Sequence, residues 1–278
     1  MNAIEIRGLE KRFRDFSLCG IDLSLPEGCI LGLVGENGAG KTTFIKTMLD
    51  LYHRDTGSVK ILGRSVPEDL TEIRRGISVL LDDVGLPAQF TAADTDSVMR
   101  DTFGDWDSAS FFSVLERFGV PADKSFSELS QGMKKKTGIA VALSHGARLL
   151  VLDEPTSGLD PVARDIFLDM LADYTRREDC AVIFSSHIVT DLEKICDYIC
   201  FLREGRVWLF EEKDRLTEEY GVISVSLEDA EKIPQEKIAG IRKNSYGAQL
   251  IMHKSQIGPG KEVSPVTLED LFVMMARR

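Results

Sequence analysis

The chain has 278 residues, which is enough for one large domain or two modest ones with a substantial core. Lysine and arginine total 34 against 45 aspartates and glutamates, and the net charge of −11 argues against a nucleic-acid binder, which must neutralise phosphates. No stretch approaches the roughly 20 apolar residues of a membrane-spanning helix, and the charged first residues do not resemble an export signal.

Short β-rich runs alternate with helical patterns along the chain, which is typical of a mostly parallel sheet with helices on its faces. The runs are apolar almost throughout, which predicts strands buried on both faces. The predicted strands are Gly28–Val34, Gly76–Leu81, Leu149–Leu152, Ala181–Ser185 and Tyr198–Leu202. The sequence therefore predicts an α/β fold.

Two regions depart from this alternation. From Thr91 to Val120 large apolar residues recur at helical spacing without a strand signal, which predicts an inserted helical subdomain over about residues 88–145. The aromatics from Trp106 to Phe118 form either the core of this subdomain or a surface for a partner. Residues 221–278 show short alternating runs and then an amphipathic helix from Thr267, which predicts a small α+β appendage.

The five cysteines are odd in number and include no Cys-x-x-Cys pair, which favours reduced thiols in the cytosol over a disulfide framework. Cys196 and Cys200 flank a predicted helix-to-strand junction. We expect these two side chains to be buried as small apolar groups.

An eight-residue segment after the first predicted strand matches the P-loop pattern, and a helical pattern follows from Thr43. The segment consists of Gly35, Glu36, Asn37, Gly38, Ala39, Gly40, Lys41 and Thr42. Its glycines allow backbone N–H groups and the helix N-terminus to face phosphates. Lys41 is expected to reach the β and γ oxygens, and the Thr42 hydroxyl to hold Mg²⁺. The sequence therefore predicts a nucleotide site that extends to Thr43.

Two other predicted strands end in polar side chains. Asp153 and Glu154 follow Leu149–Leu152, where Asp153 would anchor the hydration shell of Mg²⁺ and Glu154 would orient or deprotonate an attacking water. Taken alone, such a pair can also be a solvated strand end. His187, one of four histidines, follows Ala181–Ser185 and is either a hydrogen-bonded structural residue or a γ-phosphate contact.

A third motif, Leu129-Ser130-Gln131-Gly132-Met133, resembles the Leu-Ser-Gly-Gly-Gln signature of ABC transporter ATP-binding subunits. The likeness covers essentially the whole chain, because Ser157-Gly158-Leu159-Asp160 is similar to the D-loop and His187 to the switch histidine of that family. Phe13 is similar to the aromatic that stacks on adenine, although it could equally be a strand residue that packs inward.

The resemblance implies an α/β ATPase cassette over residues 1–220, with ATP and Mg²⁺ as cofactors and Glu154, His187 and Lys41 as catalytic residues. It also implies a head-to-tail dimer, in which Ser130 and Gly132 of one subunit face the γ-phosphate held by the other. Asp160 would contribute to the same nucleotide-binding interface.

Two motifs depart from the family pattern. Gln131 and Met133 replace a glycine and a glutamine of the signature, and a thioether cannot make the hydrogen bonds of an amide. Asp82 and Asp83 stand where the family places the Q-loop glutamine, so Asp82 is a candidate metal or coupling residue, or else the pair is a solvated turn. The lysines at 134–136, just after the signature, either approach the nucleotide or acidic residues of the membrane partner or, as we expect, lie on a solvated helix face.

A bacterial export-type branch of the family, associated with antibiotic resistance or envelope stress, resembles this chain in both departures and in two further segments. The segments are Phe103-Gly104-Asp105-Trp106 and the C-terminal Thr267-Leu268-Glu269-Asp270-Leu271-Phe272. The resemblance implies a separate integral membrane subunit, a homodimer or a heterodimer with a similar ATPase, and no nucleic-acid partner. It also implies a cytoplasmic location on the inner face of the cell membrane. The alternatives are a soluble ABC ATPase acting on the ribosome, or an uptake-system ATPase.

Overall fold

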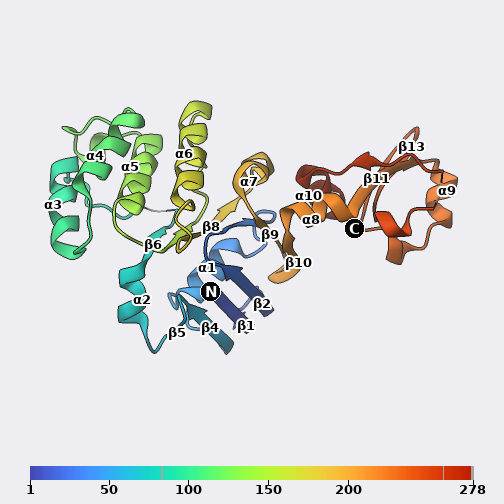
Figure 1. The fold of residues 1–278 in the computed structure, drawn as a ribbon, viewed down its shortest axis with the longest axis horizontal. Helices are drawn as coiled ribbons and strands as arrows, with labels where there is room; N and C mark the ends of the chain where they lie inside the picture. The colour runs from blue at the N-terminus through green and yellow to red at the C-terminus, as the bar shows by residue number, and fades with distance from the viewer. Residues whose placement is uncertain (83, 259, 277–278) are drawn as a thin grey trace.

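The computed structural model describes residues 1–82, 84–258 and 260–276. A helical region, a central region with two sheets, and a C-terminal unit lie in a row along the long axis (Figure 1). Within the described ranges, no helix is long and apolar enough to cross a bilayer.

All five cysteines lie in these ranges as free thiols, and burial raises the pKa of Cys200 to about 12. Cys196 and Cys200 are buried, as predicted.

The central sheet has six strands, of which five run parallel and the edge strand β10 pairs antiparallel with β9. In spatial order the strands are β10 (Arg206–Glu212), β9 (Tyr198–Arg203), β3 (Ile30–Val34), β8 (Ala181–Ser186), β7 (Leu149–Leu152) and β6 (Ile77–Leu80). The five strands read from the sequence are these parallel strands, so the predicted fold class is confirmed.

Both faces of this sheet are covered by other elements. Side chains alternate between the two faces along each strand, so neighbouring residues of one strand belong to different cores. Val34, Leu152 and Phe184 belong to the core that holds the apolar sides of α6 (Pro161–Tyr174) and α7 (Val189–Ile195). Leu33, Val151 and Ile183 belong to a second core, shared with α1 (Lys41–Met48) and another sheet. The sheet is therefore buried on both faces, which explains its continuous apolar runs.

The second sheet is antiparallel and comes mainly from the N-terminal part of the chain. Its order is β2 (Ser17–Pro26), β1 (Asn2–Arg12), β4 (Thr56–Ile61) and β5 (Arg64–Val66), and α2 (Leu70–Gly76) follows. This sheet was not predicted, although Ile4 and Ile6 alternate with more exposed residues. That period of two is the signal for a half-buried strand.

The helical region is built from three capped helices. They are α3 (Ala92–Thr102), α4 (Ser108–Arg117) and α5 (Gln131–Leu143), with the 3-10 turn η1 (Phe126–Glu128) before α5. Thr91, Asp107 and Ser130 cap the helices by accepting hydrogen bonds from free backbone N–H groups. Phe111 is fully buried, so the aromatics mainly form a local core. The inserted helical subdomain is thereby confirmed, while its limits at about 88–145 stay a prediction.

The C-terminal unit has its own four-stranded sheet and a small core. Its elements are β11 (Tyr220–Val225), α9 (Leu227–Lys232), η2 (Gln235–Lys237), β12 (Gly240–Asn244), β13 (Gly247–His253), η3 (Lys254–Gln256), β14 (Ser264–Pro265) and α10 (Leu268–Ala276), preceded by α8 (Lys213–Glu219). Helix α10 packs against α7 and stacks Phe272 on Phe201 at 6.0 Å between ring centroids. The proposed division at residue 220 falls at the first residue of β11 and remains a prediction.

His145, at the end of the helical region, makes folding sensitive to acid. Its ring stacks on Phe103 at 4.4 Å, and burial lowers the pKa of His145. Below the unfolded pKa of about 6.5, the unfolded chain binds a proton at this histidine while the folded protein resists protonation. The free energy of unfolding therefore falls as the pH falls through this range, by up to about 1.4 kcal/mol per pH unit. We expect His145→Phe, which keeps the stacking, to lose less stability than wild type between pH 7.5 and 5.5 in urea unfolding. Equal losses in the two proteins would contradict this.

Candidate nucleotide site

The P-loop connects β3 to α1, and its shape depends on two glycines. Gly40 has φ of 106°, a left-handed conformation, and a β-carbon there would also overlap the ring of Phe16. A β-carbon on Gly35 would overlap the carbonyl oxygen of Leu202 on the neighbouring strand. The loop can therefore curl tightly against β9 only with glycine at both positions.

Lys41 places a positive charge at the floor of the site. Its ammonium donates to the Gly35 carbonyl at 2.8 Å and lies 3.4 Å from a carboxylate oxygen of Glu154. The side chain is only 7 % exposed, so this charge depends on its partners for stabilisation. Lys41, the first residue of α1, therefore links the P-loop to Glu154, which follows β7.

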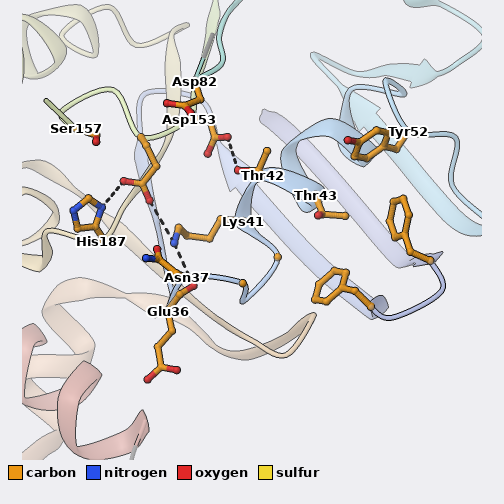
Figure 2. Close-up of a pocket in the computed structure, with 15 residues that line it drawn as sticks. Glu36, Asn37, Lys41, Thr42, Thr43, Tyr52, Asp82, Asp153, Ser157 and His187 are labelled. Carbon is orange, nitrogen blue, oxygen red and sulfur yellow. Dashed lines mark hydrogen bonds and ion pairs between the residues drawn. The ribbon is translucent and has the colours of Figure 1, made fainter. Parts of the chain in front are cut away.

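Asp153 is fully buried at the end of β7 and accepts two hydroxyl hydrogen bonds. Thr42 donates to Oδ2 at 2.6 Å (Figure 2). Ser185 of β8 donates to Oδ1 at 2.6 Å. Hydroxyl and carboxylate oxygens are the ligands that Mg²⁺ prefers, and it usually takes one or two carboxylates together with substrate phosphates. In the ranges described, no cluster of three or more acidic, histidine or cysteine side chains could hold a metal alone. Thr42 and Asp153 therefore fit a metal that arrives with a nucleotide.

Glu154 is held in place by its backbone and by a histidine. Its φ of 48° is unusual for a residue with a side chain, and such conformations cost about 1–3 kcal/mol unless the surroundings impose them. The Glu154 N–H donates to Ser185 Oγ at 2.8 Å. The Glu154 carboxylate pairs with Nδ1 of His187 at 2.7 Å. Glu154 therefore lies between Lys41 and His187 in the lining of the cleft.

These groups line one cleft of about 690 Å³. Its far wall is aromatic, with Phe13, Phe16 and Tyr52 among the lining residues. Phe13 is 41 % exposed and meets Tyr52 edge to face at 5.4 Å, so it does not pack inward. The cleft thus joins a charged floor to an apolar wall, as a molecule with phosphates and a flat ring requires.

Most of the predicted site residues line this cleft, and some do not. Those that line it are Phe13, Glu36, Asn37, Gly38, Gly40, Lys41, Thr42, Thr43, Asp82, Asp153, Glu154 and His187. Gly35 contributes only its carbonyl to Lys41, and Ala39 faces the other side of the loop. Ser130, Gly132 and Asp160 lie outside the cleft, while Asp83 lies outside the described residues.

Four lining or supporting residues were missed, namely Phe16, Tyr52, Ser157 and Ser185. Ser185 had a usable signal, because it is the last residue of the predicted strand Ala181–Ser185, and this strand lies between the P-loop strand and the acidic strand. Tyr52 had a weaker one, as an aromatic beyond the end of α1 with no apolar pattern around it. Ser157 also had a signal, because it begins the segment similar to the D-loop, of which only Asp160 was predicted to bind nucleotide. Phe16 had no signal of its own.

The family model described as ABC transporter matches residues 18–157, about half of the chain, across the P-loop, the signature and Asp153. The chain belongs to the ABC transporter family. It is an ATP-binding subunit of that family and an ATPase. The export-type likeness drawn from the motifs is confirmed by the relatives that follow.

Two relatives of this ABC transporter ATPase are named for transport. The Nod factor export ATP-binding protein I of Burkholderia lata is 35 % identical over 212 residues, covering 73 % of this chain and 68 % of the relative. The bacitracin transport ATP-binding protein BcrA of Enterococcus faecalis is 31 % identical over 207 residues, covering 73 % and 67 %.

Solved structures show the same fold. The ATP-binding subunit of an ABC transporter superposes with a TM-score of 0.71 at 24 % identity, covering 78 % of this chain and 92 % of the other. A cassette described as the dimeric post-hydrolysis state bound to ADP and Pi has a TM-score of 0.66 at 20 % identity, covering 75 % and 98 %. At this identity the likeness concerns the fold alone.

Proposed function

We propose that this ABC transporter ATPase drives export through a separate membrane subunit by ATP-dependent head-to-tail dimerisation. The observation that carries the proposal is the composition of the cleft, which contains the P-loop, Asp153, Glu154 and His187 but no signature residue. Ser130 and Gly132 lie at the start of α5, apart from the cleft. A second ATPase, identical or similar, would supply these donors to the exposed phosphate side of the nucleotide.

The proposed chemistry assigns one task to each group of the cleft. Phe13 and Tyr52 would stack on the adenine, and Lys41 and the P-loop N–H groups would neutralise the β and γ oxygens. Glu154 would accept a proton from the water that attacks the γ-phosphorus, while the bond to the bridging oxygen of ADP breaks. His187 would orient the Glu154 carboxylate. Mg²⁺, held by Thr42 and Asp153, would neutralise charge on the phosphates when bound.

A groove on the helical region is the proposed seat of the membrane subunit. It has a volume of about 570 Å³ and lies between β6 and the helical region. Its lining includes the apolar Val79, Met99 and Phe103 and two arginines, Arg74 and Arg75. We propose that it accepts a cytoplasmic helix of the membrane subunit with an apolar face and acidic residues. Such a subunit would hold the chain on the inner face of the cell membrane.

Val79→Asp tests this function. Val79 is 38 % exposed in the groove, and an apolar helix docked there would bury the new carboxylate without a partner, which is costly. We expect capture of integral membrane protein by the tagged ATPase, trapped with ATP and vanadate, to fall roughly fivefold or more. ATP binding should stay unchanged.

Leu227→Asp is the matched control, since Leu227 is 42 % exposed on α9, in the C-terminal unit. It should capture as much membrane protein as wild type. Copurification with ribosomes in place of membrane protein would overturn the transport function and favour the ribosomal alternative.

A further inference from the structure

Three consecutive lysines near the start of α5 contact three different parts of the molecule. Lys134 lies over the ring of Phe126 at 5.4 Å, and Lys136 donates to Asp160 at 3.0 Å. Lys135, between them, donates to Asp82 at 3.3 Å. The expectation of a solvated helix face is therefore wrong for Lys135, whose side chain is buried.

The Lys135 and Asp82 pair is asymmetric in exposure. The side chain of Lys135 is 8 % exposed and that of Asp82 is 84 % exposed. A buried ammonium is costly without a counter-charge, and among the residues that the structure describes Asp82 is the one carboxylate that pairs with Lys135. The lysine therefore constrains the aspartate, while the aspartate stays open to the cleft that it lines.

Close packing of α5 on β6 brings the two residues together. Gly138 lies one turn after Lys135 on the same face of α5. A β-carbon on Gly138 would come within 2.9 Å of Leu80 and Val84 side chains, which flank Asp82 in the chain. A larger residue at 138 would push the helix away, so the contact belongs to the packing of the helical region on the central sheet.

We propose that Lys135 is a positioning residue that acts through Asp82, neutralising its charge and holding it toward α5 at the edge of the nucleotide cleft. Asp82, Asp153 and Glu154 all line this cleft, which must receive a polyanionic triphosphate. Without Lys135, Asp82 would add an unpaired negative charge opposite the phosphates. The inference rests on the proposed nucleotide site and makes Asp82 a coupling residue between the signature helix and that site.

A double-mutant cycle tests whether Lys135 acts through Asp82. The affinity for fluorescent mant-ATP is measured for wild type, Lys135→Met, Asp82→Asn and the double variant, each with Mg²⁺ and with EDTA. We expect Lys135→Met to weaken binding about three- to fivefold in the Asp82 background, since the carboxylate is exposed and screened. In the Asp82→Asn background the same change should have almost no effect. Both results should hold without metal, because they depend on charge.

Controls separate this mechanism from others. Lys134→Met removes a neighbouring charge that has an aromatic partner, and it should bind mant-ATP like wild type. Lys135→Arg keeps the charge and should also bind normally, while thermal melting checks that each variant is folded. Equal weakening by Lys135→Met in both backgrounds, or none in either, would overturn the inference. Failure of wild type to bind mant-ATP would instead overturn the nucleotide site itself.

Discussion

Glu154→Gln is expected to reduce steady-state ATP hydrolysis by about 10²- to 10⁴-fold, the usual contribution of a positioned general base. Glutamine has nearly the same shape as glutamate but cannot accept the proton of the attacking water. The change keeps Lys41, Thr42 and Asp153, and the Gly35 carbonyl still holds the Lys41 ammonium, so ATP binding should persist. Dimers that form on ATP binding would then accumulate, because hydrolysis no longer separates them.

Phosphate release and size-exclusion chromatography with ATP measure these two effects. Glu178→Gln is the matched control, since Glu178 is an exposed residue outside the cleft lining, and it should retain normal turnover without a dimer peak. His187→Ala should lie between wild type and Glu154→Gln, because it removes only the 2.7 Å contact that orients the carboxylate. Normal turnover in Glu154→Gln would remove Glu154 from the role of base.

The sequence predicted the polar floor of the cleft because of a general property of parallel sheets. Strands β3, β7 and β8 are adjacent and parallel, so the residues that follow their carboxyl ends meet at one edge. Lys41, Asp153 and His187 come after these strands, each marked by an apolar run. Local patterns therefore sufficed to place groups that are far apart in the chain.

The sequence could not predict contacts that depend on how separate regions pack. Lys135 stands in a run of three lysines whose composition indicates a solvated face, yet α5 packs so closely on β6 that this lysine is buried against Asp82. Tyr52 lines the cleft only because the chain after α1 turns back toward Phe13. Neither the burial of Lys135 nor the position of Tyr52 has a signature in the local sequence, because both depend on contacts with residues that are distant in the chain.

Lys41→Ala is expected to weaken ATP binding about 10- to 100-fold and to reduce turnover to background, because it removes a charge-assisted contact to the phosphates. The floor of the cleft holds Lys41 through the Gly35 carbonyl and Glu154, so the ammonium is already oriented before a nucleotide arrives. Glu154 keeps His187 as a partner when the lysine is lost, so we expect the variant to fold. Isothermal titration with ATP and Mg²⁺ measures the affinity.

Lys60→Ala provides the comparison for this change. Lys60 is an exposed lysine of β4 outside the cleft lining, so its loss lowers the net positive charge equally without touching the site. A matching loss of affinity in both variants would mean that the affinity for ATP depends on the overall charge of the protein and not on Lys41. Unchanged affinity in Lys41→Ala would contradict the P-loop assignment, because no other ammonium lines the described cleft. A loss confined to Lys41→Ala ties phosphate recognition to the loop between β3 and α1.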